Sequence, residues 1–264
     1  MKKTNPNYNP LAKLSLLQIL FYRSRTLVLY LLMTILSIVL FMVMLILIPL
    51  GWRIRMYIYH GWCKTAVHLI KIICGIKLNV QGKINIKNIS YKNKNPVIFI
   101  SNHQSLLETL VLPSILPPIV YVLKKELFYV PFFGWGLYLS KNIGIDRSKK
   151  TNALRQVLTK GKESLKLGLS VLVFPEGTRT APFKLNRFQK SGAMLAHSAN
   201  VPIIPIALDS AFCWPNKKII AIPGTVNIII GPKINTKDIK TQQAHELATK
   251  WILDKRSYLE SKRI

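Results

Sequence analysis

The stretch VIFISNHQSLLETL, Val97 to Leu110, joins an apolar run to an abrupt cluster of hydrogen-bonding side chains. A short, continuous apolar run is typical of a strand that is covered on both faces of a sheet. Four polar residues follow at the carboxyl end of this predicted strand: Asn102, His103, Gln104 and Ser105. Functional sites of open α/β sheets gather at that end. The stretch therefore predicts a buried parallel strand with a functional site directly after it.

The same pattern recurs along the chain and predicts the fold class. Continuous apolar runs occur at residues 96–101, 119–123, 171–175 and 203–208, whereas residues 77–86 alternate like a half-exposed strand. Helical stretches occur at residues 152–168, 192–200 and 241–260. We therefore expect an α/β fold with a mixed, largely parallel central sheet flanked by helices, formed by residues 77–264. Pro202 and Pro205 indicate that the run at 203–208 is an edge or bulged strand.

His103 and Glu108 are the candidate catalytic pair. Residues five apart on a continuous helix point about 140° away from each other, so these side chains meet only if a helix begins between them. Ser105 is a suitable N-cap for that start. Two interpretations of the carboxylate remain open. Glu108 only satisfies the backbone N–H of Ser105 in an S-x-x-E capping box, or it orients the His103 imidazole as a general base.

Three further polar clusters follow later parts of the predicted sheet. They contain Asp146 and Arg147, then Pro175, Glu176, Gly177, Thr178 and Arg179, and finally Lys190. A guanidinium can hold a phosphate through two parallel hydrogen bonds, which makes Arg179 a candidate for binding an anionic substrate. Each cluster alone also fits an ordinary surface ion pair or a strand-ending turn with solvated side chains.

An uncharged stretch from Thr26 to Trp52 predicts a membrane segment. Its length exceeds the roughly 20 apolar residues that a helix needs to cross a bilayer. It is also far longer than the apolar region of roughly 7–15 residues in a cleavable signal peptide, so we expect it to remain in the mature protein. Residues 1–76 are therefore expected to form a hydrophobic, helical N-terminal membrane anchor.

Residues 53–75 predict a second, amphipathic helix after the apolar stretch. Its polar stripe consists of Arg53, His60, Lys64, His68 and Lys71. Such a basic helix is typical of the lipid headgroup region. Because basic residues flank the apolar stretch on both sides, the positive-inside rule favours a two-helix hairpin in the cytoplasmic leaflet, with a single span as its rival. A core helix of the following domain is the alternative for residues 53–75.

The chain is strongly basic. Lysine and arginine total 38 against 10 acidic residues, which gives the 264 residues a net charge of +28. This balance implies an anionic partner, namely lipid, nucleic acid or a phosphorylated substrate. A nucleic-acid-binding protein is the rival class, although the sequence has no recognised fold signature of one. Cys63, Cys74 and Cys213 lack metal-ligand spacing, so we expect reduced thiols and neither a disulfide nor a zinc site.

The order of the clusters resembles the glycerolipid acyltransferase family, and within it the bacterial 1-acyl-sn-glycerol-3-phosphate acyltransferases. The pattern N-H-x4-E at 102–108 is followed by G-I-D-R at 144–147, F-P-E-G-T-R at 174–179 and V-P-I-I-P-I at 201–206. Each block alone is weak, but together they are highly specific. The family pattern most often has Asp where this chain has Glu108, and Glu preserves the carboxylate while adding one methylene.

The resemblance implies transfer of an acyl group from acyl-CoA or acyl-carrier protein to the sn-2 hydroxyl of lysophosphatidic acid. This step of phospholipid biosynthesis requires no cofactor and no metal ion. In the family's pattern His103 is the general base and Glu108 its orienting acid. A rival acceptor is another lysolipid, either a lysophospholipid or a lyso-ornithine-type lipid without phosphate.

The resemblance also implies which residues bind the substrate and where the protein acts. The expected substrate-binding residues are Arg147, Glu176, Gly177, Thr178, Arg179 and Lys190. Arg179 is the first choice for holding the acceptor phosphate and Arg147 the second. Glu176 and Gly177 are expected to shape the loop that carries Arg179. Residues 77–264 are expected to be an acyltransferase domain on the cytoplasmic side of a bacterial inner membrane, in contact with the lipid bilayer.

Overall fold

The computed structural model of the protein describes residues 8, 10–90, 94–148, 150–216 and 218–263. Over these residues one sheet contains seven strands: β1 (Ile76–Gln81), β2 (Ile98–Ser101), β3 (Ile119–Lys124), β4 (Ile143–Ile145), β5 (Ser170–Val173), β6 (Ile203–Leu208) and β7 (Gly224–Ile230). Their order across the sheet is β1-β7-β6-β2-β5-β3-β4, and every neighbouring pair is parallel except β6 and β7. The predicted mixed, largely parallel sheet is confirmed.

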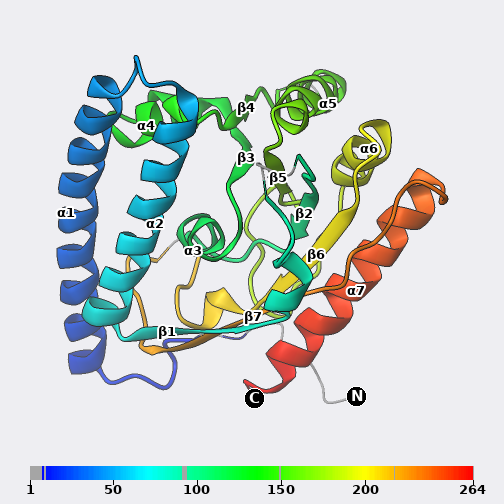
Figure 1. Cartoon of the computed structure of the whole chain (residues 1–264). Coiled ribbons are helices and arrows are strands. Elements are labelled where there is room, and N and C mark those ends of the chain that lie inside the picture. Colours follow the sequence, from blue (N-terminus) through cyan, green and yellow to red (C-terminus); the bar gives the residue numbers. More distant parts are fainter. Residues whose placement is uncertain (1–7, 9, 91–93, 149, 217, 264) are drawn as a thin grey trace.

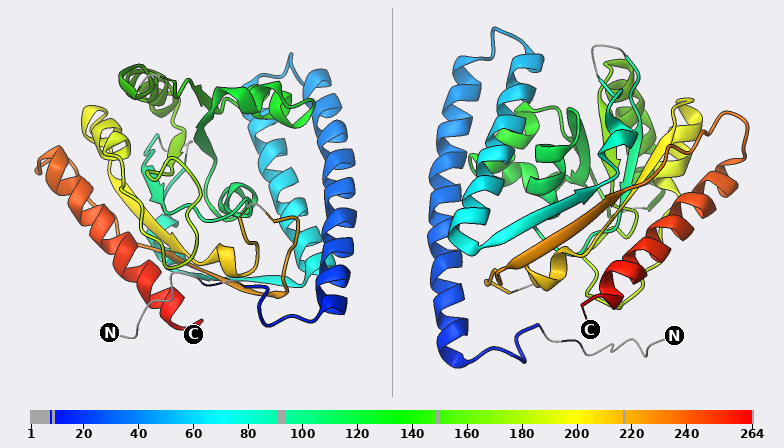
Figure 2. Two further views of the ribbon diagram at one scale, coloured as in Figure 1. Left: turned by 180° about the vertical axis from the view of Figure 1, so that it is seen from behind. Right: turned by 60° about the horizontal axis from the view of Figure 1, so that its bottom comes forward.

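Helices cover both faces of this sheet (Figure 1). They are α1 (Leu16–Ile46), α2 (Trp52–Cys74), α3 (Glu108–Ile115), α4 (Phe133–Leu139), α5 (Lys150–Lys166), α6 (Ser191–Ser198) and α7 (Thr241–Ser261). Short 3-10 helices are η1 (Lys83–Ile86), η2 (Lys125–Tyr129) and η3 (Ser210–Phe212). Helix α3, with α2 and α1 beyond it, lies on one side of the sheet, and α5, α6 and α7 lie on the other (Figures 1 and 2).

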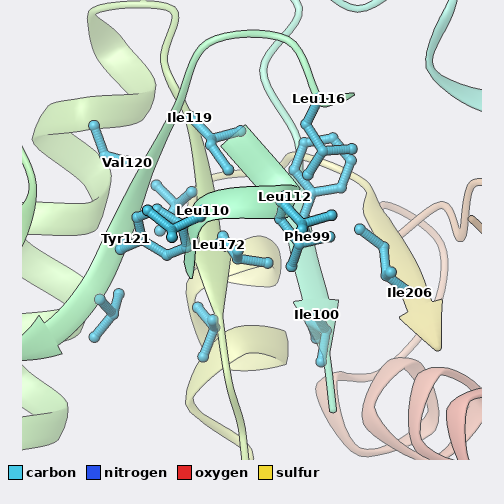
Figure 3. Close-up of a cluster of buried hydrophobic side chains, with 14 of the residues drawn as sticks. Phe99, Ile100, Leu110, Leu112, Leu116, Ile119, Val120, Tyr121, Leu172 and Ile206 are labelled. Atoms are coloured by element: carbon cyan, nitrogen blue, oxygen red, sulfur yellow. The ribbon is translucent and has the colours of Figure 1, made fainter. Parts of the chain in front are cut away.

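The core between α3 and the sheet places the polar cluster that follows β2. Phe99 of β2, Tyr121 of β3 and Leu172 of β5 pack with Leu110 and Leu112 of α3 (Figure 3). All five side chains are buried, and full burial of an aliphatic or aromatic side chain contributes roughly 1.5–3 kcal/mol. This packing holds α3 against the adjacent strands β2, β5 and β3 and so fixes the start of the helix next to the loop that follows β2.

Two details of the predicted strands are wrong. The stretch 77–86 is not one strand, because β1 stops before Gly82, which has φ +77° and lies so close to Ile230 that a Cβ atom would collide with its carbonyl oxygen. The run at 203–208 is not an edge strand, because β6 pairs with β2 on one side and β7 on the other. Between the pairs Ile206–Ile230 and Ile203–Ile234 the segment after β7 has one residue more than β6, so the extra residue lies in that segment, and β6 itself pairs with β2 without a break.

Helix α2 is packed into the protein along one face, and this corrects the predicted basic stripe. His60 is buried, its Nδ1 lies 2.8 Å from the Met56 carbonyl oxygen, and its Nε2 accepts the backbone N–H of Ile119 at 3.2 Å. These partners place the imidazole among core contacts instead of on the outer surface. Lys64 and Lys71 of the stripe are exposed. The inner face of α2 thus behaves as a core helix, while its outer face remains basic.

Helix α1 packs against α2 and α4 but leaves much of its apolar surface uncovered. It is the one helix within the described part of the chain that is long and apolar enough to cross a membrane. Leu31, Ile35, Val39 and Met42 are between 48% and 63% exposed. The helix is tied to the rest of the fold at Thr26, whose hydroxyl accepts the backbone N–H of Ala221 at 2.8 Å. The boundary proposed between residues 76 and 77 stays a prediction.

Candidate active site

The loop that carries His103 leaves β2 at a fixed position. The buried amide of Asn102 donates through Nδ2 to the carbonyl oxygen of Leu208 and accepts the backbone N–H of the same residue, both at 3.0 Å. The His103 ring stacks on Phe174, which follows β5, with ring centroids 4.2 Å apart and planes inclined by 19°. The side chain of His103 is 14% exposed. The imidazole is therefore held from behind and open to solvent on a small part of its surface.

His103 and Glu108 converge, as the sequence predicted. Nδ1 of the imidazole lies 3.3 Å from Oε2 of Glu108, a distance typical of an ion pair, although the angle is outside that of a hydrogen bond. Among the described residues neither Nδ1 nor Nε2 has a hydrogen-bond partner. The carboxylate thus faces one ring nitrogen and leaves the opposite nitrogen, Nε2, available to a substrate.

The carboxylate of Glu108 also binds the backbone before the helix. It accepts the N–H of Gln104 at 3.0 Å and that of Ser105 at 2.9 Å, and the hydroxyl of Ser210 donates to it as well. The predicted N-cap at Ser105 is wrong, because α3 begins at Glu108 and the Ser105 hydroxyl accepts the N–H of Leu107. Only one half of a capping box is present. Glu108 therefore does both things that the sequence left open: it satisfies backbone amides and faces the imidazole.

Glu176 joins the His103 loop to the loop after β5. Its Oε1 accepts the backbone N–H of His103 at 3.0 Å, and the hydroxyl of Thr180 donates to its Oε2. The backbone N–H of Thr180 in turn donates to the carbonyl oxygen of His103 at 2.8 Å. Burial raises the pKa of the Glu176 carboxyl to about 7, while the His103 N–H acts in the opposite direction. Glu176 thus connects two loops from a buried position.

The exposed part of this second loop carries Gly177, Thr178 and Arg179. Gly177 has φ +69°, a left-handed conformation that favours glycine. Arg179 is half-buried and forms no hydrogen bond or ion pair with the residues that the structure describes. Its guanidinium lies close enough to Tyr30 of α1 for the charge to interact electrostatically with the phenol group. Arg179 is therefore an uncommitted guanidinium on the side of the loop that faces the N-terminal helices.

Arg147 has a different setting from Arg179. Its Nη1 donates to the carbonyl oxygen of Gly177 at 2.5 Å, so the guanidinium is partly committed to supporting the loop. Burial lowers the pKa of Arg147. Asp146, its neighbour in sequence, does not pair with it but binds Lys125. The two arginines from the predicted substrate-binding set thus differ, one being tied to the loop and the other free to bind a ligand.

A groove of about 1580 Å³ lies between the sheet and helices α5, α6 and α7. It is lined by five residues of the predicted substrate-binding set: Arg147, Glu176, Gly177, Thr178 and Lys190. His103, Glu108 and Arg179 do not line it. Phe174 does line it and stacks on His103 with its ring. The predicted site residues therefore fall into two groups that meet at the loop after β5.

The described residues contain no group of three His, Cys, Asp or Glu side chains that could hold a metal ion. Cys63, Cys74 and Cys213 are free and buried. Sequence reasoning missed several polar residues that support the site: Ser210 of η3 and, from α7, Arg256 and Glu260. The only signal for Glu260 was the scarcity of acidic residues in so basic a chain.

A family model described as Acyltransferase matches residues 77–209. The chain belongs to this acyltransferase family. It is 40% identical over 190 residues to the 1-acyl-sn-glycerol-3-phosphate acyltransferase of Pseudomonas aeruginosa, which covers 72% of this chain and 71% of that protein. It is 34% identical over 188 residues to the protein of the same name from Saccharomyces cerevisiae, covering 69% of this chain and 60% of the yeast protein.

The fold of this acyltransferase also resembles a solved one. The crystal structure of the 1-acyl-sn-glycerophosphate (LPA) acyltransferase PlsC from Thermotoga maritima aligns with a TM-score of 0.71 and 22% sequence identity. The alignment covers 88% of this chain and 95% of that one, so it extends well beyond residues 77–209 and supports the overall architecture. The expected family and the expected fold class are thus both confirmed.

Proposed function

We propose that this acyltransferase moves a fatty acyl group from a thioester donor to the sn-2 hydroxyl of 1-acyl-sn-glycerol-3-phosphate and so forms phosphatidic acid. The contact between His103 and Glu108 carries the proposal, because it supplies a base with an orienting acid. The names of the relatives from Pseudomonas aeruginosa and Saccharomyces cerevisiae support the choice of substrate.

The chemistry proceeds by direct attack on the thioester. Nε2 of His103 takes the proton of the acceptor hydroxyl as that oxygen attacks the thioester carbonyl carbon. Glu108, 3.3 Å from Nδ1, stabilises the imidazolium that forms. When the carbon–sulfur bond breaks, the leaving thiolate takes the proton back from the imidazolium. The base is thereby restored and the products are the ester and a free thiol.

Arg179 is the proposed partner of the acceptor phosphate. It is half-buried, has no hydrogen bond or ion pair within the described ranges, and lies on the side of the α1 helix, where a lipid acceptor would arrive. Charge-assisted hydrogen bonds from a guanidinium to phosphate are among the strongest that proteins form. Arg147, with Thr178 and Lys190, lines the groove on the other side of the loop, and Glu176 and Gly177 shape the loop itself.

The proposed site of action is the cytoplasmic face of a bacterial inner membrane. The exposed apolar residues of α1 and the exposed Lys64 and Lys71 of α2 support contact with an anionic bilayer. A hairpin within one leaflet places both chain ends on one face. Reporter tags at residue 5 and at the C-terminus test this arrangement, and tags on opposite faces would exclude the hairpin.

The direct test of the reaction uses purified protein and radiolabelled lysophosphatidate with acyl-CoA and acyl-carrier protein as donors in turn. Labelled phosphatidic acid with at least one donor is the expected product. A parallel reaction with a lysolipid that lacks phosphate distinguishes the acceptor class. Faster acylation of the phosphate-free lipid would move the assignment to another lysolipid acyltransferase and leave Arg179 without its proposed ligand.

A further inference from the structure

The C-terminal half of α7 reaches the candidate active site from outside the residues matched to the family model. It carries two charged side chains that are almost fully buried, Arg256 at 0% exposure and Glu260 at 4%. Burying a charge is costly unless partners satisfy it. The contacts of these two residues therefore show what the helix contributes to the site.

Glu260 binds two segments of the site at once. Its Oε1 accepts the side-chain Nε2–H of Gln104 at 2.7 Å, and its Oε2 accepts the backbone N–H of Phe183 at 3.1 Å. Gln104 directly follows His103 in sequence and is fully buried. The segment at Phe183 directly follows the loop that carries Arg179. One carboxylate on α7 thus spans the two loops that hold the proposed base and the proposed phosphate ligand.

Arg256 completes this arrangement from one turn earlier on the same helix. Its Nε donates to Oε1 of Glu260 at 2.8 Å, which fixes the carboxylate for Gln104. Its Nη2 donates to the carbonyl oxygens of Ala181 at 3.0 Å and Lys184 at 2.7 Å. A planar guanidinium can serve these directions together, whereas an ammonium group on a flexible stem cannot.

We propose that Arg256 and Glu260 are positioning residues of the acyl-transfer reaction, which fix His103 through Gln104 and fix Arg179 through the segment 181–184. The inference rests on the proposed function, because it takes His103 as the base and Arg179 as the phosphate ligand. Misplacing a reacting group by about 1 Å can reduce a rate on the order of 10²-fold. These two side chains, which do not line the groove, therefore act on turnover through the loops that they hold.

The charge of Arg256 also acts on a second carboxyl next to the His103 loop. Its field lowers the pKa of Glu176, the carboxyl that accepts the His103 backbone N–H, and so opposes the effect of burial. Two buried carboxyls of the site are thus linked to one guanidinium, Glu260 by a hydrogen bond and Glu176 by its charge. Replacing Arg256 with Lys retains the positive charge and loses the planar fork, which separates the effect of charge from that of geometry.

The test measures kcat and the KM of each substrate for three single variants, Arg256→Lys, Glu260→Gln and Gln104→Ala. It also includes the double variant that combines Glu260→Gln with Gln104→Ala. We expect kcat to fall about 10- to 100-fold in each single variant, with the KM of the donor changed less than about threefold. The acceptor KM should rise in Arg256→Lys and Glu260→Gln, which also loosen the segment next to Arg179, but not in Gln104→Ala. Glu260→Gln introduces an amide NH2 group among three donors, so at least one of them loses its acceptor. Lys255→Met, an exposed neighbour on α7, is the matched control and should retain full turnover.

The double variant separates positioning from general stability. If Glu260 acts through Gln104, adding Glu260→Gln to Gln104→Ala should cost little further kcat, because the link is already broken. Losses in kcat that multiply, or unchanged kcat in a variant whose urea midpoint equals that of the wild type, would overturn the inference. Wild-type protein that fails to acylate lysophosphatidate would instead overturn the proposed function. If Arg256→Lys does not fold, the comparison between Gln104→Ala and the double variant still decides.

Discussion

The backbone N–H of His103 donates to Oε1 of Glu176, 3.0 Å away, and so joins the loop after β2 to the loop after β5. Burial raises the pKa of this carboxyl from its ordinary 4.5 to about 7. A raised carboxyl pKa means that the folded state binds the proton more tightly than the unfolded state. Glu176 therefore contributes stability that is fully present below pH 4.5 and is lost as the pH rises through about 7.

Replacing Glu176 with Gln removes this titration while keeping an oxygen that can accept the His103 N–H. We expect the urea midpoint of the wild type to fall relative to that of Glu176→Gln as the pH rises from 4.5 to 8, most of the change being complete slightly above pH 7. Comparing the two proteins cancels the titration of other groups. Glu163→Gln on the exposed side of α5 is the control, and parallel curves for wild type and Glu176→Gln would contradict the assigned effect.

His103→Ala removes the proposed general base. We expect acyl transfer to fall by about 10²–10⁴-fold or more, because a positioned base contributes that much. The urea midpoint should stay near that of the wild type, since the side chain is partly open to solvent and Phe174 is the one ring on which it stacks among the described residues. His197→Ala, on the exposed surface of α6, is the control variant. Near-normal turnover in His103→Ala would show that His103 is not the general base.

Glu108→Gln tests which of the two roles of this carboxylate limits catalysis. The variant keeps one oxygen for the backbone amides of Gln104 and Ser105 but presents an NH2 group to Nδ1. Nδ1 must then accept, which places the ring proton on Nε2 and blocks the base. We expect kcat to fall about 10²-fold or more.

Glu108→Asp is the matched comparison, because it keeps a carboxylate at the position where the family pattern most often has Asp. It should retain more turnover than Glu108→Gln. Equal turnover in Glu108→Gln and the wild type would show that Glu108 only accepts the backbone N–H groups and does not orient His103.

The main elements of the fold were predicted from local patterns. Strands β2, β3, β5 and β6 form continuous apolar runs because both faces of each are covered, and such runs are visible in the sequence. The sequence prediction omitted β7, whose alternating exposure reflects its place beside the edge strand β1. The antiparallel pairing of β6 and β7 depends on contacts between distant segments, which no local pattern records.

For the candidate site too, contacts between residues close in sequence were predictable, and contacts between distant segments were not. The convergence of His103 and Glu108 follows from a helix start between them, which the local sequence indicates. The buried position of Glu176 does not follow, because a carboxylate in a turn resembles a solvated one until its partners are known. Arg256 and Glu260 face the site only because one side of α7 packs against loops far away in the sequence. Their contacts with the site become visible only in the folded chain, where α7 lies against both loops.

The exposed apolar face of α1 is expected to contact lipid, so charged residues introduced on it should weaken membrane binding. Leu31 and Val39 lie eight residues apart on the same side of the helix and are 63% and 52% exposed. A carboxylate within the hydrocarbon region costs several kcal/mol, so Leu31→Glu with Val39→Glu should sharply reduce sedimentation with anionic vesicles. Leu167→Glu, an exposed leucine after α5, is the control. Unchanged sedimentation of the double variant would show that this face does not contact lipid.

Arg179→Ala distinguishes the two arginines of the loop. The loss of a charge-assisted hydrogen bond to phosphate corresponds to about a 10- to 100-fold loss in affinity, so the KM for lysophosphatidate should rise by that amount. The KM for the acyl donor should change much less, and Arg155→Ala on the exposed side of α5 should leave both constants unchanged. Arg147→Ala should affect both substrates more evenly, because its Nη1 supports the loop at Gly177. A larger rise in the donor KM for Arg179→Ala would reassign this guanidinium to the donor, and the acceptor phosphate would then need another cation.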